Sequence, residues 1–260
     1  MSVPSFAPTG PIFCLTADAD WASEYCMQDF TELTESFGIR PTIFATHESN
    51  VIRQSLTRGQ VEVGLHPNFY PGTTHAEDHN DTEGVIDHVL GLYPEAETFR
   101  CHRFHDSTPI ALAMMKRNIR YDSNLCCYLQ AGLFPLRQGF GSMRFPVFWE
   151  DDVHWCNNPG DWHAGSYLDH FFTPGLKILN VHPFMVTSNC TSGEHYDRIK
   201  HHIPGLNETT LEQARFNGPG SRTFLMDILG EVTRRGCRFH TLKELFAMYA
   251  QVPGGPFAAR

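Results

Sequence analysis

Short apolar segments rich in β-branched and aromatic residues alternate along this chain with stretches of helical periodicity, and this alternation limits the possible folds most strongly. The strand-like segments are 11–17, 42–45, 61–65, 98–100 and 176–181. The helical patterns cover 23–37, 48–58, 82–92, 107–118, 221–235 and 241–250. Gly38, Gly59 and Gly236 stand where three of these helices should end. This order predicts an α/β protein with a parallel sheet, either open or closed into a barrel.

Length and charge narrow the class of protein further. A chain of 260 residues can bury a core without disulfides, and we expect one domain over 1–260. A long insertion at about 187–220 would either cover a site or extend from the surface. The formal net charge is -9 and the basic residues are scattered, which argues against a nucleic-acid partner.

The N-terminal residues and the lengths of the apolar runs bear on the expected cellular location of the protein. Residues 1–10 have neither the basic start nor the apolar core of a signal peptide, and no later run approaches the length of a membrane span. We therefore expect a cytoplasmic protein without a membrane span. The oligomeric state stays open.

The first strand-like segment ends in two carboxylates. Asp18 and Asp20 are two positions apart, so a continued strand would direct both side chains to the same side. Two carboxylates so near each other repel unless a metal ion, a shared proton or an arginine compensates their charge. The alternative is that they cap the helix that begins near Ser23.

Three further strand-like segments end in, or are followed by, a histidine or an arginine, residue types that often act in catalytic sites. His66 follows the third segment, Arg100 the fourth and His182 the last. The carboxyl ends of parallel strands are where α/β proteins place their sites. Carboxylate plus imidazole suits zinc, iron, cobalt or nickel. The eight cysteines contain no CxxC pair, which favours an open catalytic metal site over a structural one and predicts reduced thiols.

The order of these motifs resembles the polysaccharide deacetylases of carbohydrate esterase family four. The matching segments are Thr16-Ala17-Asp18-Ala19-Asp20, Glu62-Val63-Gly64-Leu65-His66, Phe99-Arg100-Cys101, Phe148-Trp149-Glu150-Asp151-Asp152 and Leu179-Asn180-Val181-His182. Segments 66–72 and 145–152 are most similar to the WbmS-like branch, which is associated with surface-glycan gene clusters. The resemblance implies a distorted, incomplete (β/α) barrel of the polysaccharide-deacetylase type.

The resemblance also implies roles for individual residues. Asp18 corresponds to the general base of the family, Asp20 to a metal ligand, and His66 to a second ligand. His182 corresponds to the general acid, and Arg100 would hold Asp18 ionised. The implied cofactor is a divalent metal ion, zinc before iron, cobalt or nickel. It would act as a Lewis acid while Asp18 takes a proton from water and His182 protonates the leaving amine.

The second motif departs from the family pattern. The family has a second histidine four residues after the first, and this chain has Tyr70 there. We expect His75 to be the third metal ligand, because it precedes the next predicted helix and lies near the same rim. His79, His102 and His105 are the alternatives.

The fourth motif departs as well, because it carries additional carboxylates and aromatic rings. Trp149, Trp155 and Trp162 fall within fourteen residues. Exposed aromatic rings suit the apolar faces of sugars and carboxylates suit their hydroxyls. We therefore expect Trp149 and Asp152, with His102, to bind substrate; the alternative for each tryptophan is core packing.

Together these features predict a metal-dependent hydrolase. It would remove an N-acyl group, acetyl in the first instance, from an amino sugar or a sugar-linked intermediate of glycan biosynthesis. The expected partner is a carbohydrate or a small amide. Two alternatives stay open: a deformylase or other small-amide hydrolase on the same scaffold, and a catalytically silent carbohydrate-binding protein, which the missing second-motif histidine would explain.

Overall fold

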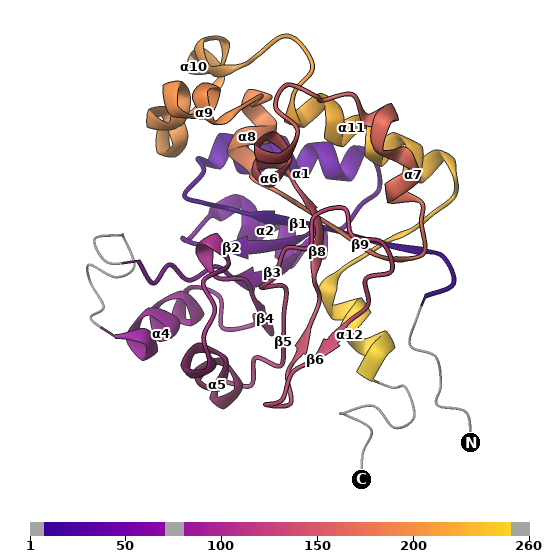
Figure 1. Ribbon diagram of the computed structural model, residues 1–260. Coiled ribbons are helices and arrows are strands. Elements are labelled where there is room, and N and C mark those ends of the chain that lie inside the picture. Colours follow the sequence, from indigo (N-terminus) through magenta and orange to yellow (C-terminus); the bar gives the residue numbers. More distant parts are fainter. Residues whose placement is uncertain (1–7, 71–80, 251–260) are drawn as a thin grey trace.

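The computed structural model describes residues 8–70 and 81–250 (Figure 1). The strands are β1 (Pro11–Asp18), β2 (Thr42–Ala45), β3 (Glu62–Leu65), β4 (Thr98–Phe99), β5 (Tyr121–Asp122), β6 (Leu136–Arg137), β7 (Met143–Arg144), β8 (Val147–Glu150), β9 (Gly175–Val181) and β10 (Phe239–His240). The α-helices are α1 (Glu24–Ser36), α2 (Asn50–Thr57), α4 (Thr82–Leu92), α5 (Thr108–Lys116), α6 (Asp151–Asn157), α7 (Leu168–Phe171), α8 (Pro183–Ser188), α9 (Gly193–Ile199), α10 (Glu208–Ala214), α11 (Ser221–Arg234) and α12 (Leu242–Ala250). Three short 3-10 helices are η1 (His102–Phe104), η2 (Ala164–Tyr167) and η3 (Lys200–Gly205).

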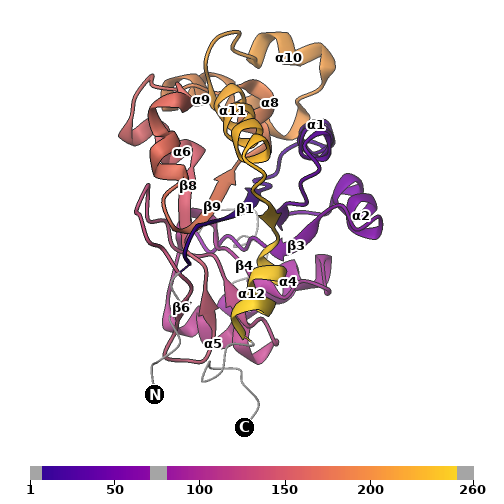
Figure 2. The ribbon, with the colours of Figure 1, turned by 90° about the vertical axis from the view of Figure 1, so that its right-hand side faces the viewer.

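The strands form one curled sheet. Their order is β6-β7-β5-β4-β3-β2-β1-β9-β8, and β10 pairs with β1. The pairings are parallel except for β6 with β7. In both views α6 and α8 to α11 lie together at the upper end, whereas α4, α5 and α12 lie at the lower end (Figures 1 and 2). None of the helices within the described ranges is both long and apolar enough to cross a membrane.

The segment after β5 pairs with β8, the strand at one edge of the curled sheet. The backbone N–H of Val147 donates to Leu125, and those of Cys127 and Leu129 donate to Val147 and Phe148, each at 2.8 Å. This short pairing between 125–129 and β8 brings the sheet round into a half-barrel. The predicted α/β class and the distorted, incomplete (β/α) barrel are therefore confirmed.

Helix α1 shows why the predicted helices form where they do. The Ser23 hydroxyl accepts a hydrogen bond from the Cys26 backbone N–H, which caps the first turn. Met27, Phe30 and other residues at helical spacing turn one face into the core. The helix ends before Gly38, whose φ of 67° is a left-handed conformation that glycine adopts readily.

The sheet order places the ends of several functional strands next to one another. β1 is flanked by β2 and β9, β3 follows β2, and β4 follows β3. The register pairs Thr16 with Asn180 and Leu65 with Phe99, so residues just after β1, β3, β4 and β9 emerge at one rim.

The predicted insertion at about 187–220 consists largely of α9, η3 and α10, and it packs on the start of α1. The Ser23 backbone N–H donates to Ile203 at 3.1 Å, and the Ser23 hydroxyl donates to Leu206 at 2.6 Å. Tyr196 of α9 contacts Phe184 of α8 edge to face. These contacts hold the insertion on the same side of the sheet as α1 and α8.

Candidate active site

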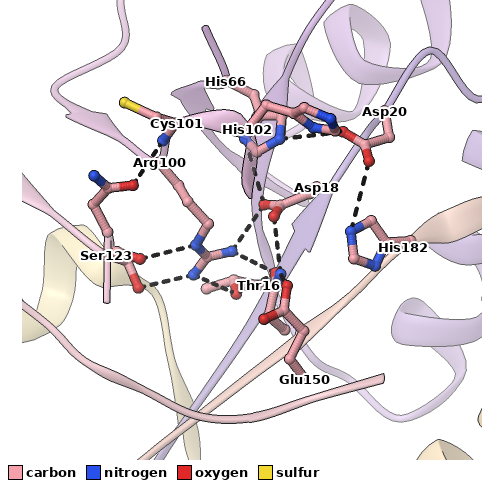
Figure 3. Close-up of polar contacts among 12 residues, drawn as sticks. Thr16, Asp18, Asp20, His66, Arg100, Cys101, His102, Ser123, Glu150 and His182 are labelled. Atoms are coloured by element: carbon pink, nitrogen blue, oxygen red, sulfur yellow. Dashed lines mark hydrogen bonds and ion pairs between the residues drawn. The ribbon is translucent and has the colours of Figure 1, made fainter. Parts of the chain in front are cut away.

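Asp20 lies at the centre of a cluster of histidines at the rim (Figure 3). Its Oδ1 is 3.1 Å from His66 Nε2 and 3.1 Å from His102 Nδ1. Its Oδ2 is 3.6 Å from His182 Nε2. Asp18 joins the cluster, with Oδ1 3.8 Å from His66 Nδ1. The strand ends that the sequence singled out therefore meet in one place.

A left-handed turn directs Asp20 towards these histidines. β1 ends at Asp18, and Asp20 and Trp21 have φ values of 44° and 57°, which few non-glycine residues adopt. The Ala19 N–H donates to Phe44 and the Trp21 N–H to the Thr46 hydroxyl, both at 3.0 Å, and these bonds hold the turn. The two carboxylates thus share a site through this turn and not through a continued strand, and Ser23, not either aspartate, caps α1.

A second left-handed turn positions His102. Arg103 and Phe104 have φ values of 55° and 51°. The His102 backbone N–H donates to Pro67 at 3.0 Å, which ties this turn to the loop that carries His66. The edge of the His102 ring also packs against Trp21, with ring centroids 5.8 Å apart.

Arg100 supports Asp18 from within the barrel. Its guanidinium is fully buried and donates to Asp18 Oδ1 at 2.8 Å, while Asn180 donates to Asp18 Oδ2 at 2.9 Å. Further hydrogen bonds to Ser123 and Thr16 fix the guanidinium. Burial alone would raise the pKa of Asp18, but Arg100 and then the neighbouring histidines outweigh it and hold this pKa below its ordinary value. Asp18 is therefore a buried carboxylate that stays ionised.

Asp151 supports His182 in a similar way. The His182 Nδ1 is 2.7 Å from Asp151 Oδ1, and the His182 backbone N–H donates to Asp151 Oδ2 at 2.9 Å. Burial lowers the pKa of His182, but the Asp151 carboxylate raises it well above its ordinary value. This histidine is suited to carry a proton that it can donate.

Asp20, His66 and His102 fit a divalent metal ion. Each offers one donor atom, and these atoms lie within 4.8 Å of one another. His66 is buried, and within the described part of the chain its Nε2 approaches Asp20 Oδ1 at 3.1 Å without the geometry of a hydrogen bond. Burial raises the pKa of Asp20, but the neighbouring His102 and His66 hold it well below its ordinary value. Three protein ligands of this kind are typical of catalytic zinc sites.

His102, one of the alternatives for the third ligand, lies beside Asp20 and His66. His75, the predicted ligand, and its alternative His79 lie outside the described residues. His102 was assigned to substrate binding; its Nδ1 is 3.1 Å from Asp20 Oδ1, and its role stays a prediction. His105 follows η1 and is exposed.

The prediction that Trp149 lines a saccharide-binding wall is wrong. Its side chain is 0% exposed and stacks on Phe224 of α11, with ring centroids 4.9 Å apart. Its Nε1 donates to His154 at 3.1 Å, so the indole belongs to the core. Trp162 is buried too, whereas Trp155 is half-buried and packs against Tyr196.

Asp152 lies in the first turn of α6 near His182. One of its oxygens is buried without a hydrogen-bond partner among residues 8–70 and 81–250. Burial raises the pKa of Asp152 to about 6, although His182 opposes this shift. Its assignment to substrate stays a prediction.

Several residues of the site were not assigned from the sequence. Asn180 lies in β9, two positions before His182, which directly follows that strand, and this spacing was the available signal. Glu150 and Asp151 belong to an acidic segment from which only Asp152 was singled out. Ser123 carried no signal, because it follows a strand of two residues.

The comparisons with known proteins agree with this geometry. The family model described as "WbmS-like: Polysaccharide deacetylase" matches residues 15–200. A Bordetella bronchiseptica protein described as a polysaccharide deacetylase involved in O-antigen biosynthesis is similar in structure. It has 33% sequence identity and a TM-score of 0.75, over 84% of this chain and 90% of that one.

A more distant structure shares the fold alone. The Bc1960 peptidoglycan N-acetylglucosamine deacetylase is 16% identical, with a TM-score of 0.51 over 90% of this chain and 86% of that one. A search of curated proteins gives no match. On the family model and the Bordetella structure, the chain belongs to the WbmS-like family of polysaccharide deacetylases.

Proposed function

We propose that this protein is a metal-dependent hydrolase that removes an N-acyl group, expected to be acetyl, from an amino sugar or a sugar-linked intermediate of glycan biosynthesis. One observation carries the proposal: an Asp20–His66–His102 cluster lies beside an ionised Asp18 and a proton-carrying His182. The family, and the O-antigen role described for the Bordetella relative, support a glycan substrate.

Asp20, His66 and His102 are the proposed metal ligands, with His102 in the place first given to His75. A divalent ion bound there, zinc before iron, cobalt or nickel, supplies a Lewis acid that polarises the amide carbonyl and lowers the pKa of a water. The approach of His66 Nε2 and His102 Nδ1 to the same Asp20 oxygen, each at 3.1 Å, supports this assignment.

The chain's own groups divide the proton transfers between them. Asp18 accepts a proton from the attacking water, because Arg100 and Asn180 keep its carboxylate ionised. The amide C–N bond then breaks, and His182 Nε2 donates the proton that the leaving amine needs. Asp151 orients His182 by holding its Nδ1.

The catalytically silent alternative was motivated by the histidine missing at the position of Tyr70. His102 offers an imidazole within reach of Asp20 and His66, which favours the hydrolase. Asp152, near His182, is the proposed contact for a substrate hydroxyl.

The test is hydrolysis by the metal-loaded protein. N-acetylated and N-formylated amino sugars, free and sugar-linked, are incubated with the protein before and after chelation, and the released acid and amine are both quantified. We expect release of acetate and amine in equal amounts, lost on chelation and restored by zinc. Sugar binding without release by a metal-loaded protein would contradict the proposal, and preferential release of formate would favour the deformylase.

A further inference from the structure

A second set of donor atoms lies next to the first. Asp18, Glu150 and His182 each offer one atom, and these atoms lie within 4.8 Å of one another. All three side chains are buried, with 3%, 3% and 7% exposure. Glu150 has no part in the hydrolytic steps described above, so its place in this group needs another explanation.

One oxygen of Glu150 lacks any hydrogen bond. Its Oε1 accepts from Asn180 at 2.9 Å, whereas its Oε2 is buried and has no partner among the residues that the structure describes. Figure 3 shows this carboxylate directed towards Asp18. Burying a carboxylate oxygen without a partner is costly, and a bound cation removes that cost.

His182 is oriented as a metal-binding histidine would be. Its Nδ1 faces Asp151 at 2.7 Å, which leaves Nε2 to face the cluster. Metal-binding histidines commonly donate their other ring N–H to a carboxylate in this manner. The same Nε2 is 3.6 Å from Asp20 Oδ2, while Asp20 Oδ1 faces His66 and His102. Asp20 therefore lies between the two donor sets, with one oxygen towards each.

We propose that Asp18, Glu150 and His182 form a second divalent-cation site, which shares the Asp20 carboxylate with the first. Two carboxylates, an imidazole and a bridging carboxylate suit manganese, zinc or ferrous iron. Arg100 donates to Asp18 at 2.8 Å, and its positive charge opposes a cation there. The second site therefore fills only after the first.

The second ion has a functional consequence that rests on the proposed function. It takes Asp18 and His182 out of proton transfer, so its binding inhibits hydrolysis. The enzyme is then active with one ion and inhibited by excess metal.

Manganese is the probe for this site, because carboxylates and imidazole bind it while the eight cysteines compete poorly for it. Full-length protein is titrated with Mn²⁺ in equilibrium dialysis, and the bound metal is followed by electron paramagnetic resonance. We expect two ions per chain at saturation and an exchange-coupled spectrum, because a shared carboxylate couples the two ions. Glu150→Gln should bind one ion, with an uncoupled spectrum.

Asp152→Asn is the matched control. It removes a neighbouring half-buried carboxylate that also has one buried oxygen without a partner in the described ranges but does not belong to the Asp18–Glu150–His182 group. It should still bind two ions. A wild-type protein that binds a single ion at saturation, or a Glu150→Gln variant that binds two, would overturn the second site while leaving the proposed function intact. A wild-type protein that binds none would contradict both.

Activity provides the second readout. Turnover of the wild type should fall as the second ion binds, and turnover of Glu150→Gln should stay at its own maximum over the same range of Mn²⁺. A rise in wild-type turnover with the second ion would overturn the inhibitory role.

Discussion

At the residue scale, Asp18 and Asp20 are two positions apart but face different partners. Asp18 accepts hydrogen bonds from Arg100 and Asn180, and Asp20 faces three histidines. The left-handed turn at Asp20 produces this division, which accords with the proposed roles of Asp18 as proton acceptor and Asp20 as metal ligand.

Asp18→Asn tests that division. The amide keeps the size of the side chain but cannot accept a proton, so activity should fall by about 100-fold or more. With one equivalent of metal supplied, the metal content should stay at the wild-type level. Turnover is measured by acetate release and metal by elemental analysis. Near-normal turnover would remove Asp18 from the mechanism.

Asp151→Asn tests whether the Asp151 carboxylate keeps His182 protonated. The Asp151 carboxylate raises the pKa of His182, so the histidine stays protonated until the pH rises through that raised value. Without the charge the pKa falls, and the alkaline limb of the kcat/KM profile should move to lower pH. The acidic limb, which reports Asp18, should not move. A lower rate with both limbs in place would show that Asp151 has a structural role only.

At the element scale, β3 packs so closely that its glycine has no room for a side chain. A Cβ on Gly64 would lie 2.6 Å from the Phe44 ring and 2.8 Å from the Thr98 methyl group. The Phe44 ring in turn lies under the Arg100 guanidinium, 4.4 Å from its centre. The position of Arg100, and through it that of Asp18, thus depends on the absence of a side chain at Gly64.

Gly64→Ala should therefore destabilise the fold by about 1–3 kcal/mol, the usual cost of overpacking a core. Urea denaturation gives this free energy. Gly91→Ala is the control, because nothing lies within 4 Å of its Cβ position in α4, and alanine there should stabilise by about 0.5–1 kcal/mol. Equal stability of Gly64→Ala and the wild type would contradict the close packing.

The length of each helix and strand decided whether it could be predicted from the sequence. β1, β2, β3 and β9 are runs of four or more buried residues, and the predictions placed each within a residue or two. β5, β6 and β7 have two residues each, too few for a periodic pattern, and were not predicted. α7 to α10 are helices of four to seven residues that depend on tertiary contacts.

The residues of the candidate site also differ in whether the sequence could reveal them. Asp18, Asp20, His66, Arg100 and His182 could be identified because each stands at or just after a strand. The place of His102 depends on a left-handed turn at Arg103 and Phe104, which contains no glycine to mark it.

At the scale of the whole molecule, the stack of Trp149 on Phe224 joins β8 to α11, two elements far apart in the sequence. His154, Tyr167 and Phe171 pack around the same pair. Such a contact between distant segments could not be predicted from local sequence, which is why Trp149 was assigned to substrate.

Trp149→Ala should accordingly cost about 3–5 kcal/mol of stability, the range for a large aromatic residue removed from a core. Trp149→Phe keeps a ring and should cost less, with KM for the substrate unchanged. Thermal unfolding and steady-state kinetics separate the two roles. A raised KM with unchanged stability would restore Trp149 as a sugar contact.

The metal content of three purified proteins tests most directly whether Asp20, His66 and His102 hold the ion. The wild type, His102→Ala and His75→Ala are loaded with one equivalent of zinc, separated by gel filtration and analysed for bound metal. The wild type and His75→Ala should retain one ion per folded chain, and His102→Ala should lose it. Loss of metal from His75→Ala with full retention by His102→Ala would contradict this ligand set.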